Sequence, residues 1–337
     1  NRCVMDTSDS EISFDANGHC NHCNNYFNRI APMSYHGKDS DEAFAKGIEQ
    51  IKQRGLGRKY DCVIGISGGI DSSYVAYLAK KNGLRALLVH LNNGWDTSIS
   101  EQNIQVVVDK LGFDYEVFTP DLEAFRKMQV AFLRSSTPDI ESPTDMLIQY
   151  AVHHFAVKYD VKYIISGGNF ATEGILPNTW FYNAKDCRYC KSIINTIIPG
   201  QEGREVLQKI PKFGWAQELY CKLIKGIKTV YFLNYVDYNK DQVRQLLSNE
   251  LGWKSYEGKH GESLYTAFEQ FYILPKKFNV DYRRATFSTQ ICAGTMTREE
   301  ALRQLEMPAF KEEEIKTVIE EICKLKRSSP NLSKITL

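Results

Sequence analysis

The chain has 337 residues, of which 43% are hydrophobic and 25% are charged, a composition typical of a globular protein with one large or two smaller domains. Its net charge of +1 favours neither a nucleic-acid-binding protein nor a membrane-surface protein. We find no secretory leader and no apolar stretch long enough to cross a bilayer, so we expect a cytoplasmic protein without a membrane span. The nine cysteines, an odd number, favour reduced thiols or metal ligands over a disulfide framework.

The first 36 residues are polar and carry three of the cysteines. Cys20 and Cys23 form a C-x2-C pair, the spacing that zinc sites use, and Cys3 is a third thiol upstream. We therefore expect structural zinc here. Tetrahedral zinc requires a fourth ligand, which His19 or His22 could supply. An unmetallated thiol cluster is the alternative.

From Asp61 onward, short apolar strands alternate with helices. This alternation favours a parallel sheet covered on both faces, an α/β architecture. Beyond about residue 240 the pattern is mostly helical. We expect a cysteine-rich segment at 1–36, an α/β domain at 55–240 and a mostly helical C-terminal region at 241–337. The predicted strands are 61–67, 86–92, 114–120 and 161–168; the predicted helices are 71–83, 100–111 and one that begins at Pro143.

The stretch GISGGIDSS (65–73) lies between the first predicted strand and a helix. Glycines at such a junction let backbone N–H groups turn toward one point, and the helix start adds about half a positive charge. The hydroxyl groups of three serines add further donors, so we expect the loop to hold a phosphate. Asp71 would repel phosphates unless a cation intervened, which predicts bridging Mg²⁺. A plain serine-capped turn is the alternative. The expected phosphate ligands are Ser67, Gly68, Gly69, Ser72 and Ser73.

The sequence S-G-G-x-D-S after a strand resembles the PP-loop of the ATP pyrophosphatases, which cleave ATP to AMP and pyrophosphate. The resemblance implies an adenine nucleotide alpha hydrolase-like, Rossmann-like fold for 55–240, with ATP bound by residues 67–73. A second stretch, SGGNFATEG (166–174), is similar to one in nicotinamide-dinucleotide synthetases whose glutamate helps to hold Mg²⁺. This similarity implies that Asp71 and Glu173 are the catalytic metal pair. It also implies that Gly167, Gly168, Asn169 and Thr172 contact the nucleotide.

The stretch VHLNNGW (89–95) ends the second strand, near where adenosine would lie. Asn92, Asn93 and Trp95 are therefore candidate nucleotide contacts. Ordinary turn chemistry is an equally good explanation of the two asparagines.

Three stretches together with the PP-loop resemble the N-acetyl sugar amidotransferases of bacterial surface-polysaccharide synthesis, such as that of lipopolysaccharide O-antigen. They are RCVMDTSDSEISFDANGHCNHC (2–23), VHLNNGW (89–95) and the long stretch 256–302. The resemblance implies conversion of a sugar's acetamido group into an acetamidino group, with ATP giving AMP and pyrophosphate. It also implies two partners, a glutaminase and a cyclase-like barrel, that supply ammonia. In that family the first segment begins C-x2-C, which implies a cysteine immediately before Asn1.

The sugar that this family modifies can be acidic or nucleotide-linked, so a cationic rim is expected around the sugar. A solvated basic face is the alternative explanation of these residues. Asp145 is a further candidate that could instead only cap its helix. The basic candidates are Lys259, His260, Lys276, Lys277, Arg283 and Arg284.

A tRNA-thiolating PP-loop enzyme is the alternative function. Cys187-x2-Cys190 with Cys292 would mimic the three-cysteine iron–sulfur site of certain tRNA thiolases. Ordinary helix packing explains the i, i+3 pair as well. The near-neutral net charge disfavours an RNA substrate.

Overall fold

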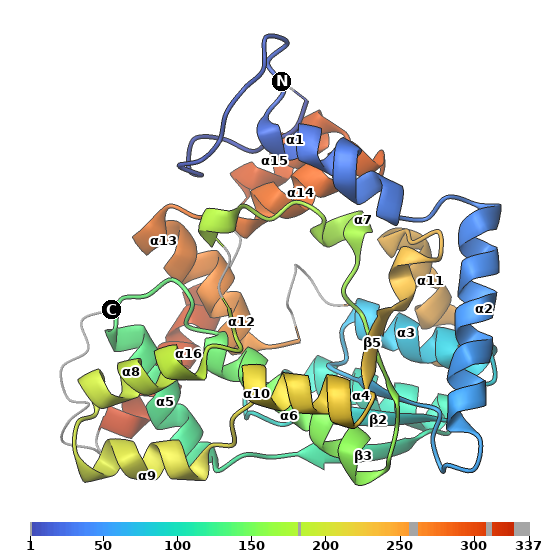
Figure 1. Ribbon diagram of the computed structural model, residues 1–337. Coiled ribbons are helices and arrows are strands. Elements are labelled where there is room, and N and C mark those ends of the chain that lie inside the picture. Colours follow the sequence, from blue (N-terminus) through green and yellow to red (C-terminus); the bar gives the residue numbers. More distant parts are fainter. Residues whose placement is uncertain (1, 181–182, 256–261, 308–311, 327–337) are drawn as a thin grey trace.

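The computed structural model describes residues 2–180, 183–255, 262–307 and 312–326 (Figure 1). Its centre is a five-stranded, fully parallel sheet with the strand order β3-β2-β1-β4-β5. The four predicted strands are confirmed. The strands are β1 (Cys62–Gly65), β2 (Ala86–Leu91), β3 (Asp114–Phe118), β4 (Tyr163–Ser166) and β5 (Lys228–Tyr231).

Side chains of successive strand residues alternate between two apolar cores, as the pleat of a strand requires. Val63 and Leu87 face one core, which α5 (Leu122–Arg134) and α6 (Ser142–Lys158) complete. Ile64 and Leu88 face the other core. Helices therefore cover both faces of the sheet, and the predicted α/β class is confirmed. The second core is completed by α2 (Lys38–Gly55), α3 (Ile70–Lys81), α4 (Ser98–Leu111) and α11 (Lys240–Leu251).

The helices beyond residue 251 divide between two parts of the molecule. Tyr265 and Phe268 of α12 (Leu264–Phe268) and Val318 of α16 (Glu312–Lys326) join the core of α5 and α6. In contrast, α14 (Tyr282–Ala293) and α15 (Arg298–Glu306) lie beside the N-terminal segment, at the top of Figure 1. The C-terminal region is helical, as expected. A π-helical turn, Glu269–Ile273, links α12 to α13 (Leu274–Phe278).

The strand β5 was not predicted from the sequence. Only Val230 of its four residues is partly buried, and the other three are exposed. An exposed edge strand lacks the continuous apolar run that revealed the four other strands. The remaining helices are α1 (Asn21–Asn25), α7 (Phe170–Glu173), α8 (Cys187–Ile197), α9 (Gln201–Lys209) and α10 (Trp215–Leu219), with a π-helical turn at Tyr220–Ile224.

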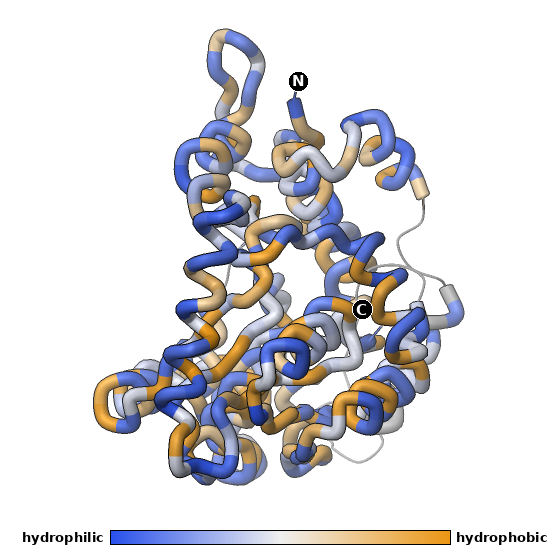
Figure 2. The backbone as a smooth tube through the Cα atoms, turned by 90° about the vertical axis from the view of Figure 1, so that its right-hand side faces the viewer, coloured by the Kyte–Doolittle hydropathy of each residue, from blue (hydrophilic) through white to orange (hydrophobic). Residues whose placement is uncertain are grey.

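Hydrophilic and hydrophobic residues are interleaved along the described helices (Figure 2). Across the described part of the chain, we find no helix with the length and apolar character needed to cross a bilayer.

Candidate functional site

Two loops meet at the point where the strand order of the sheet reverses. β1 lies between β2 and β4, and ligands of such sheets bind beyond the carboxyl ends of the strands at this point. A Cβ atom added to Gly167, after β4, would lie 3.3 Å from the Cβ of Asp71 and 3.3 Å from the backbone N of Ser72. The two glycine-rich segments singled out from the sequence are therefore in direct contact.

The loop after β1 is held closely against its neighbours. Gly68 has φ +78°, and a Cβ at this residue would lie 2.4 Å from the carbonyl oxygen of Ser100. The Gly68 carbonyl accepts hydrogen bonds from Asn103 Nδ2 (3.3 Å) and from Trp253 Nε1 (3.0 Å). Both donors are buried, so α4 and the end of α11 determine where the loop lies.

The three serines of this loop differ in their exposure to solvent. Ser67 is exposed, and its Oγ lies 3.2 Å from that of Ser72 and accepts from the N–H of Gly69 at 3.3 Å. Ser73 is fully buried, which disfavours its predicted contact with phosphate. Gly69 provides no side-chain cap for α3, so the first N–H groups of that helix remain suited to an anion.

Asp71 is the point at which the two loops are joined. Its Oδ1 accepts hydrogen bonds from Asn169 Nδ2 at 3.2 Å and from the Tyr238 hydroxyl at 2.5 Å. Asn169 caps α7, and its Oδ1 accepts from the N–H (2.9 Å) and the hydroxyl (3.0 Å) of Thr172. Asn169 and Thr172 are both buried, so their observed role is to position Asp71 and α7. Both residues are at most 5% exposed, which leaves little surface for their predicted contact with the nucleotide.

Lys240 is a site residue that the sequence analysis missed. Its Nζ lies 3.4 Å from Oδ2 of Asp71. Burial alone would lower the pKa of Lys240, but the negative charges of Asp71 and Glu173 outweigh it and raise that pKa. Glu173, exposed at the end of α7, thus acts on the same cation as Asp71. Recognition of β5 would have revealed this lysine, because Lys240 opens the helix that follows that strand.

A cavity of about 580 Å³ opens beside the two loops. One wall comes from the strand ends and the loops after them, including Ser67, Asn93 and Gly167. A second wall comes from α6 and includes Asp145. A third comes from the start of the C-terminal region: Glu262, Ser263, Thr266, Glu269 and Gln270.

Two buried glutamates, Glu141 and Glu269, lie next to each other in the lining of this cavity. Glu141 Oε1 accepts from the Thr144 hydroxyl (2.8 Å) and its Oε2 from the Thr266 hydroxyl (2.5 Å). Glu269 Oε1 accepts from the N–H of Glu141 at 3.3 Å. Burial, with the charge of Asp145, raises the pKa of Glu141 to about 7, and burial raises that of Glu269 still more clearly. The predicted candidate Asp145 therefore belongs to an acidic wall.

The basic residues of the predicted cationic rim that the structure describes lie outside the lining of this cavity. Arg283 pairs with Asp281 (2.8 Å) and donates to the Met307 carbonyl (2.8 Å). Arg284 donates to the Val4 carbonyl at 2.9 Å. These guanidinium groups hold backbone segments and do not line the cavity. Lys276 lies over the Tyr272 ring and Lys277 donates to Ser136, also outside the cavity lining, while Lys259 and His260 lie outside the described residues.

Trp95 offers little exposed surface to an adenosine. It is buried, donates from Nε1 to Gln129 Oε1 (2.9 Å) and stacks on Tyr265. Asn92 and Asn93 accept from the N–H groups of residues 94 and 95 at 3.1 and 3.0 Å, as turn residues do. Of these three residues, Asn93 alone lines the cavity.

The cysteines fall into two separate groups. Cys3, Cys20 and Cys23 are buried, and one metal ion could be held between their sulfur atoms. Neither histidine joins them, because His22 contacts Asp9 (2.6 Å) and His19 contacts Arg2 (3.3 Å). Cys187 and Cys190 pack on α8 in the core of α5 and α6. Cys292 lies with Cys23 instead, which contradicts the suggested cluster of Cys187, Cys190 and Cys292.

The parallel sheet with glycine-rich loops after β1 and β4 defines a PP-loop nucleotide-binding fold. Residues 47–166 match the family described as NAD synthase. Residues 262–333 match the family described as LPS biosynthesis protein WbpG-like, C-terminal domain. These two matches together support membership of the PP-loop ATP pyrophosphatase superfamily.

Individual relatives match only part of the chain. Over 116 residues it is 31% identical to an NH3-dependent NAD+ synthetase of Pyrococcus horikoshii, covering 34% of this chain and 44% of that protein. It is 27% identical over 125 residues to a tRNA-specific 2-thiouridylase MnmA 1 of Geobacillus kaustophilus, covering 33% of each. The chain thus spans less than half the length of these curated relatives. The solved NH3-dependent NAD synthetase of Campylobacter jejuni aligns with a TM-score of 0.38 and 12% identity, over 89% of this chain and 97% of that one.

We predict that Gly68→Ala destabilises the protein more than Gly294→Ala. Both glycines have φ +78°, where a side chain costs about 1–2 kcal/mol, but a Cβ meets the Ser100 carbonyl only at Gly68 and meets no atom within 4 Å at Gly294. Denaturant unfolding of both variants measures the difference. Equal losses would show that the approach to Ser100 is unimportant.

We predict that the free energy of unfolding falls as the pH rises from about 5 to 7. The pKa of Glu141 is raised from 4.5 to about 7 in the folded protein, which therefore keeps a proton that the unfolded chain releases. The loss is on the order of 3 kcal/mol for this residue. Glu141→Gln should make the profile less steep, with the raised pKa of Glu269 supplying the slope that remains, and Glu123→Gln, at an exposed glutamate, should leave it unchanged. An identical slope in Glu141→Gln would contradict the assignment.

Proposed function

We propose that the protein is an ATP-dependent amidotransferase that converts the acetamido group of a sugar into an acetamidino group. The observation that carries the proposal is the shared cavity. Its walls come from both matched regions, because residues 65–67 and 164–166 lie in the NAD synthase match and residues 262–270 in the WbpG-like match. A nucleotide on the loops would thus face a substrate held by the second region.

The first step would transfer adenylate to the amide oxygen. That oxygen attacks the α-phosphorus of ATP, a P–O bond breaks and pyrophosphate leaves. Ser67, the first N–H groups of α3 and Lys240 would hold the phosphates. Asp71 and Glu173 would hold Mg²⁺, which neutralises phosphate charge when bound. The raised pKa of Lys240 supports this assignment, since it reflects a negative field that favours cations.

The second step would replace the oxygen by nitrogen. Ammonia adds to the amide carbon, one proton is lost, and the C–O bond to AMP breaks to leave a cationic amidinium. Glu141, Glu269 and Asp145 lie at the cavity wall where this positive charge would form. Carboxylates also accept hydrogen bonds from sugar hydroxyls. We therefore propose a hydroxyl-rich sugar without a carboxylate near this wall, in place of the acidic sugar expected earlier.

A tRNA-thiolating enzyme is the second candidate, favoured by the relatives named as tRNA-specific 2-thiouridylases. The separation of Cys292 from Cys187 and Cys190 counts against it, because the iron–sulfur site suggested from the sequence is not assembled. Nothing in the cavity requires an RNA substrate. Because the chemistry uses ATP, we propose a cytoplasmic location.

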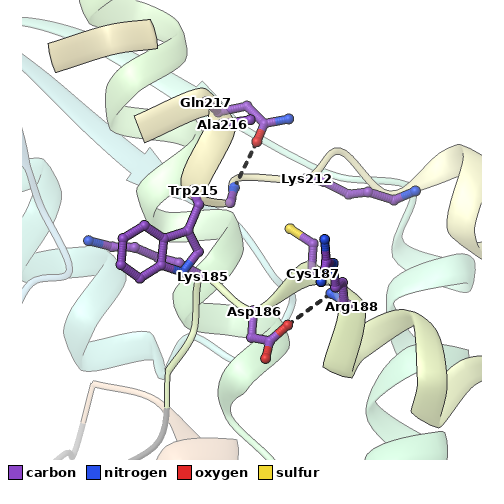
Figure 3. Close-up of a pocket in the computed structure, with 9 residues that line it drawn as sticks. Lys185, Asp186, Cys187, Arg188, Lys212, Trp215, Ala216 and Gln217 are labelled. Atoms are coloured by element: carbon purple, nitrogen blue, oxygen red, sulfur yellow. Dashed lines mark hydrogen bonds between the residues drawn. The ribbon is translucent and has the colours of Figure 1, made fainter. Parts of the chain in front are cut away.

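We further propose that a glutaminase and a cyclase-like barrel deliver ammonia at the surface of α10 and the turn after it. Leu223 and Ile224 are 70% and 72% exposed there, and Trp215 is 63% exposed. A second pocket of about 500 Å³ lies against this surface (Figure 3). Lys185 lines both pockets and pairs with Glu218 of the main cavity at 2.6 Å. In this proposal the ion pair would lie between the docked partners and the reaction site.

The function is tested by incubating the protein with ATP, Mg²⁺, ammonium and a panel of acetamido sugars. We expect AMP, pyrophosphate and a sugar that has gained a positive charge, detected by mass spectrometry. Asp71→Asn should lower pyrophosphate release at least about 100-fold, because charge stabilisation of several kcal/mol is lost. Asp241→Asn, at an exposed aspartate on the same helix as Lys240, is the control. Unchanged turnover in Asp71→Asn would refute the nucleotide site, and thiolated tRNA without sugar turnover would favour the alternative.

The partner proposal predicts that a variant of this surface loses turnover with glutamine but keeps turnover with ammonium. Leu223→Asp combined with Ile224→Asp should reduce glutamine-supported turnover with both partners present at least about tenfold, because a charged surface disfavours apolar docking. Ammonium-supported turnover should stay unchanged. Leu56→Asp, at a leucine that is 66% exposed elsewhere, is the control. Full glutamine-supported turnover in the double variant would contradict this surface.

A further inference from the structure

Four cysteine sulfur atoms converge between the N-terminal segment and α14. Cys3 Sγ lies 3.5 Å from Cys20 Sγ, and Cys292 Sγ lies 3.6 Å from Cys23 Sγ. The sulfurs of Cys3, Cys20 and Cys23 all lie within 4.8 Å of one another. All four side chains are at most 9% exposed and belong to one apolar cluster.

The Cys3–Cys20 and Cys23–Cys292 distances are close to those between neighbouring sulfurs of a metal-thiolate site. A Zn–S bond of about 2.3 Å in a tetrahedron places neighbouring sulfurs about 3.8 Å apart. A disulfide would require about 2.05 Å. Cys3, Cys20 and Cys23 could supply three ligands to one ion, and Cys292, which contacts Cys23 from a different part of the chain, could move in as the fourth.

We infer that Cys3, Cys20, Cys23 and Cys292 form a four-thiolate site for a structural divalent metal of the zinc class. Cys292 takes the fourth position, for which His19, His22 and a cysteine before Asn1 were the earlier candidates. This inference does not depend on the proposed enzymatic function. It concerns only how the metal would join the N-terminal segment to α14.

The backbone around the sulfurs is already held in place by α14 and α15. Arg284 donates to the Val4 carbonyl (2.9 Å), Arg298 donates to the Cys3 carbonyl (3.1 Å), and the Val4 N–H donates to Ser288 Oγ (3.2 Å). Arg298 thus holds the backbone of Cys3 itself, and Arg284 holds that of the next residue. A preformed ligand set of this kind lowers the ordering cost of metal binding.

The metal site lies directly behind the loop that carries Glu173. Ile175 donates its N–H to Thr289 Oγ1 of α14 at 2.9 Å. A Cβ on Gly174 would lie 2.8 Å from Ile30 Cγ2 and 3.1 Å from the Tyr26 ring, both in the segment after Cys23. The metal would therefore hold the two elements against which α7 packs.

The direct test measures metal content and thiol protection in the full-length protein. We expect about one zinc per chain, and we expect zinc to protect all four cysteines from alkylation, read out residue by residue by mass spectrometry. After removal of zinc by a chelator, Cys292 should become modified together with Cys3, Cys20 and Cys23. This measurement needs no variant, so a folding defect cannot obscure it.

Cys292→Ser provides the second arm. It should lower zinc affinity at least about tenfold and weaken the thiolate-to-metal absorption of the Co²⁺-substituted protein, because one thiolate is lost. Cys221→Ser, at a buried cysteine in a separate core, is the matched control and should change neither. The inference is overturned if Cys292 is alkylated as readily with zinc as without it. It is also overturned if Cys292→Ser keeps the full affinity and Co²⁺ spectrum, or if the four sulfurs prove to be disulfide-bonded.

Discussion

The hydrogen bond from Asn169 to Asp71 joins two loops that are almost 100 residues apart in the chain, and the geometry of the candidate site depends on it. The parallel pairing of β1 with β4 brings the two loops to the same edge of the sheet. Once they meet there, the available space is small, since Gly167 contacts the backbone at Ser72. A larger side chain at Gly167 would push the two loops apart, and Asp71 would then lose its hydrogen bond from Asn169.

The acidic cavity follows from the same arrangement. The carboxyl ends of the strands form its floor, and α6 places Glu141 against the segment that enters α12. Two buried carboxyl groups of which one raises the pKa of the other favour a shared proton or a bound cation. The wall opposite the glycine-rich loops therefore favours neutral or cationic groups over anionic ones. This preference separates the substrate proposed here from the acidic sugars that the resemblance alone suggested.

Much of the sheet and both loops could be predicted from the sequence, because buried strands and glycine-rich turns leave local signals. Asp71 and Glu173 were found in this way, and Lys240 was missed because the strand before it lies at an exposed edge. The structure gives Arg283, Arg284 and Trp95 packing and backbone contacts that the sequence did not indicate. Arginine that binds backbone carbonyls has the same local sequence as arginine that binds a ligand, and a buried tryptophan in a turn resembles an exposed one. Only the tertiary contacts distinguish them.

The packing of residues 3–23 against α14 and α15 also affects the order in which the protein can form during synthesis. The strands of the sheet span residues 62–231, so the nucleotide-binding core can condense while the C-terminal helices are still on the ribosome. The first cysteines must wait, reduced and exposed, until residue 292 has emerged. The N-terminal segment, the first part of the described chain to be made, is therefore among the last to complete its packing.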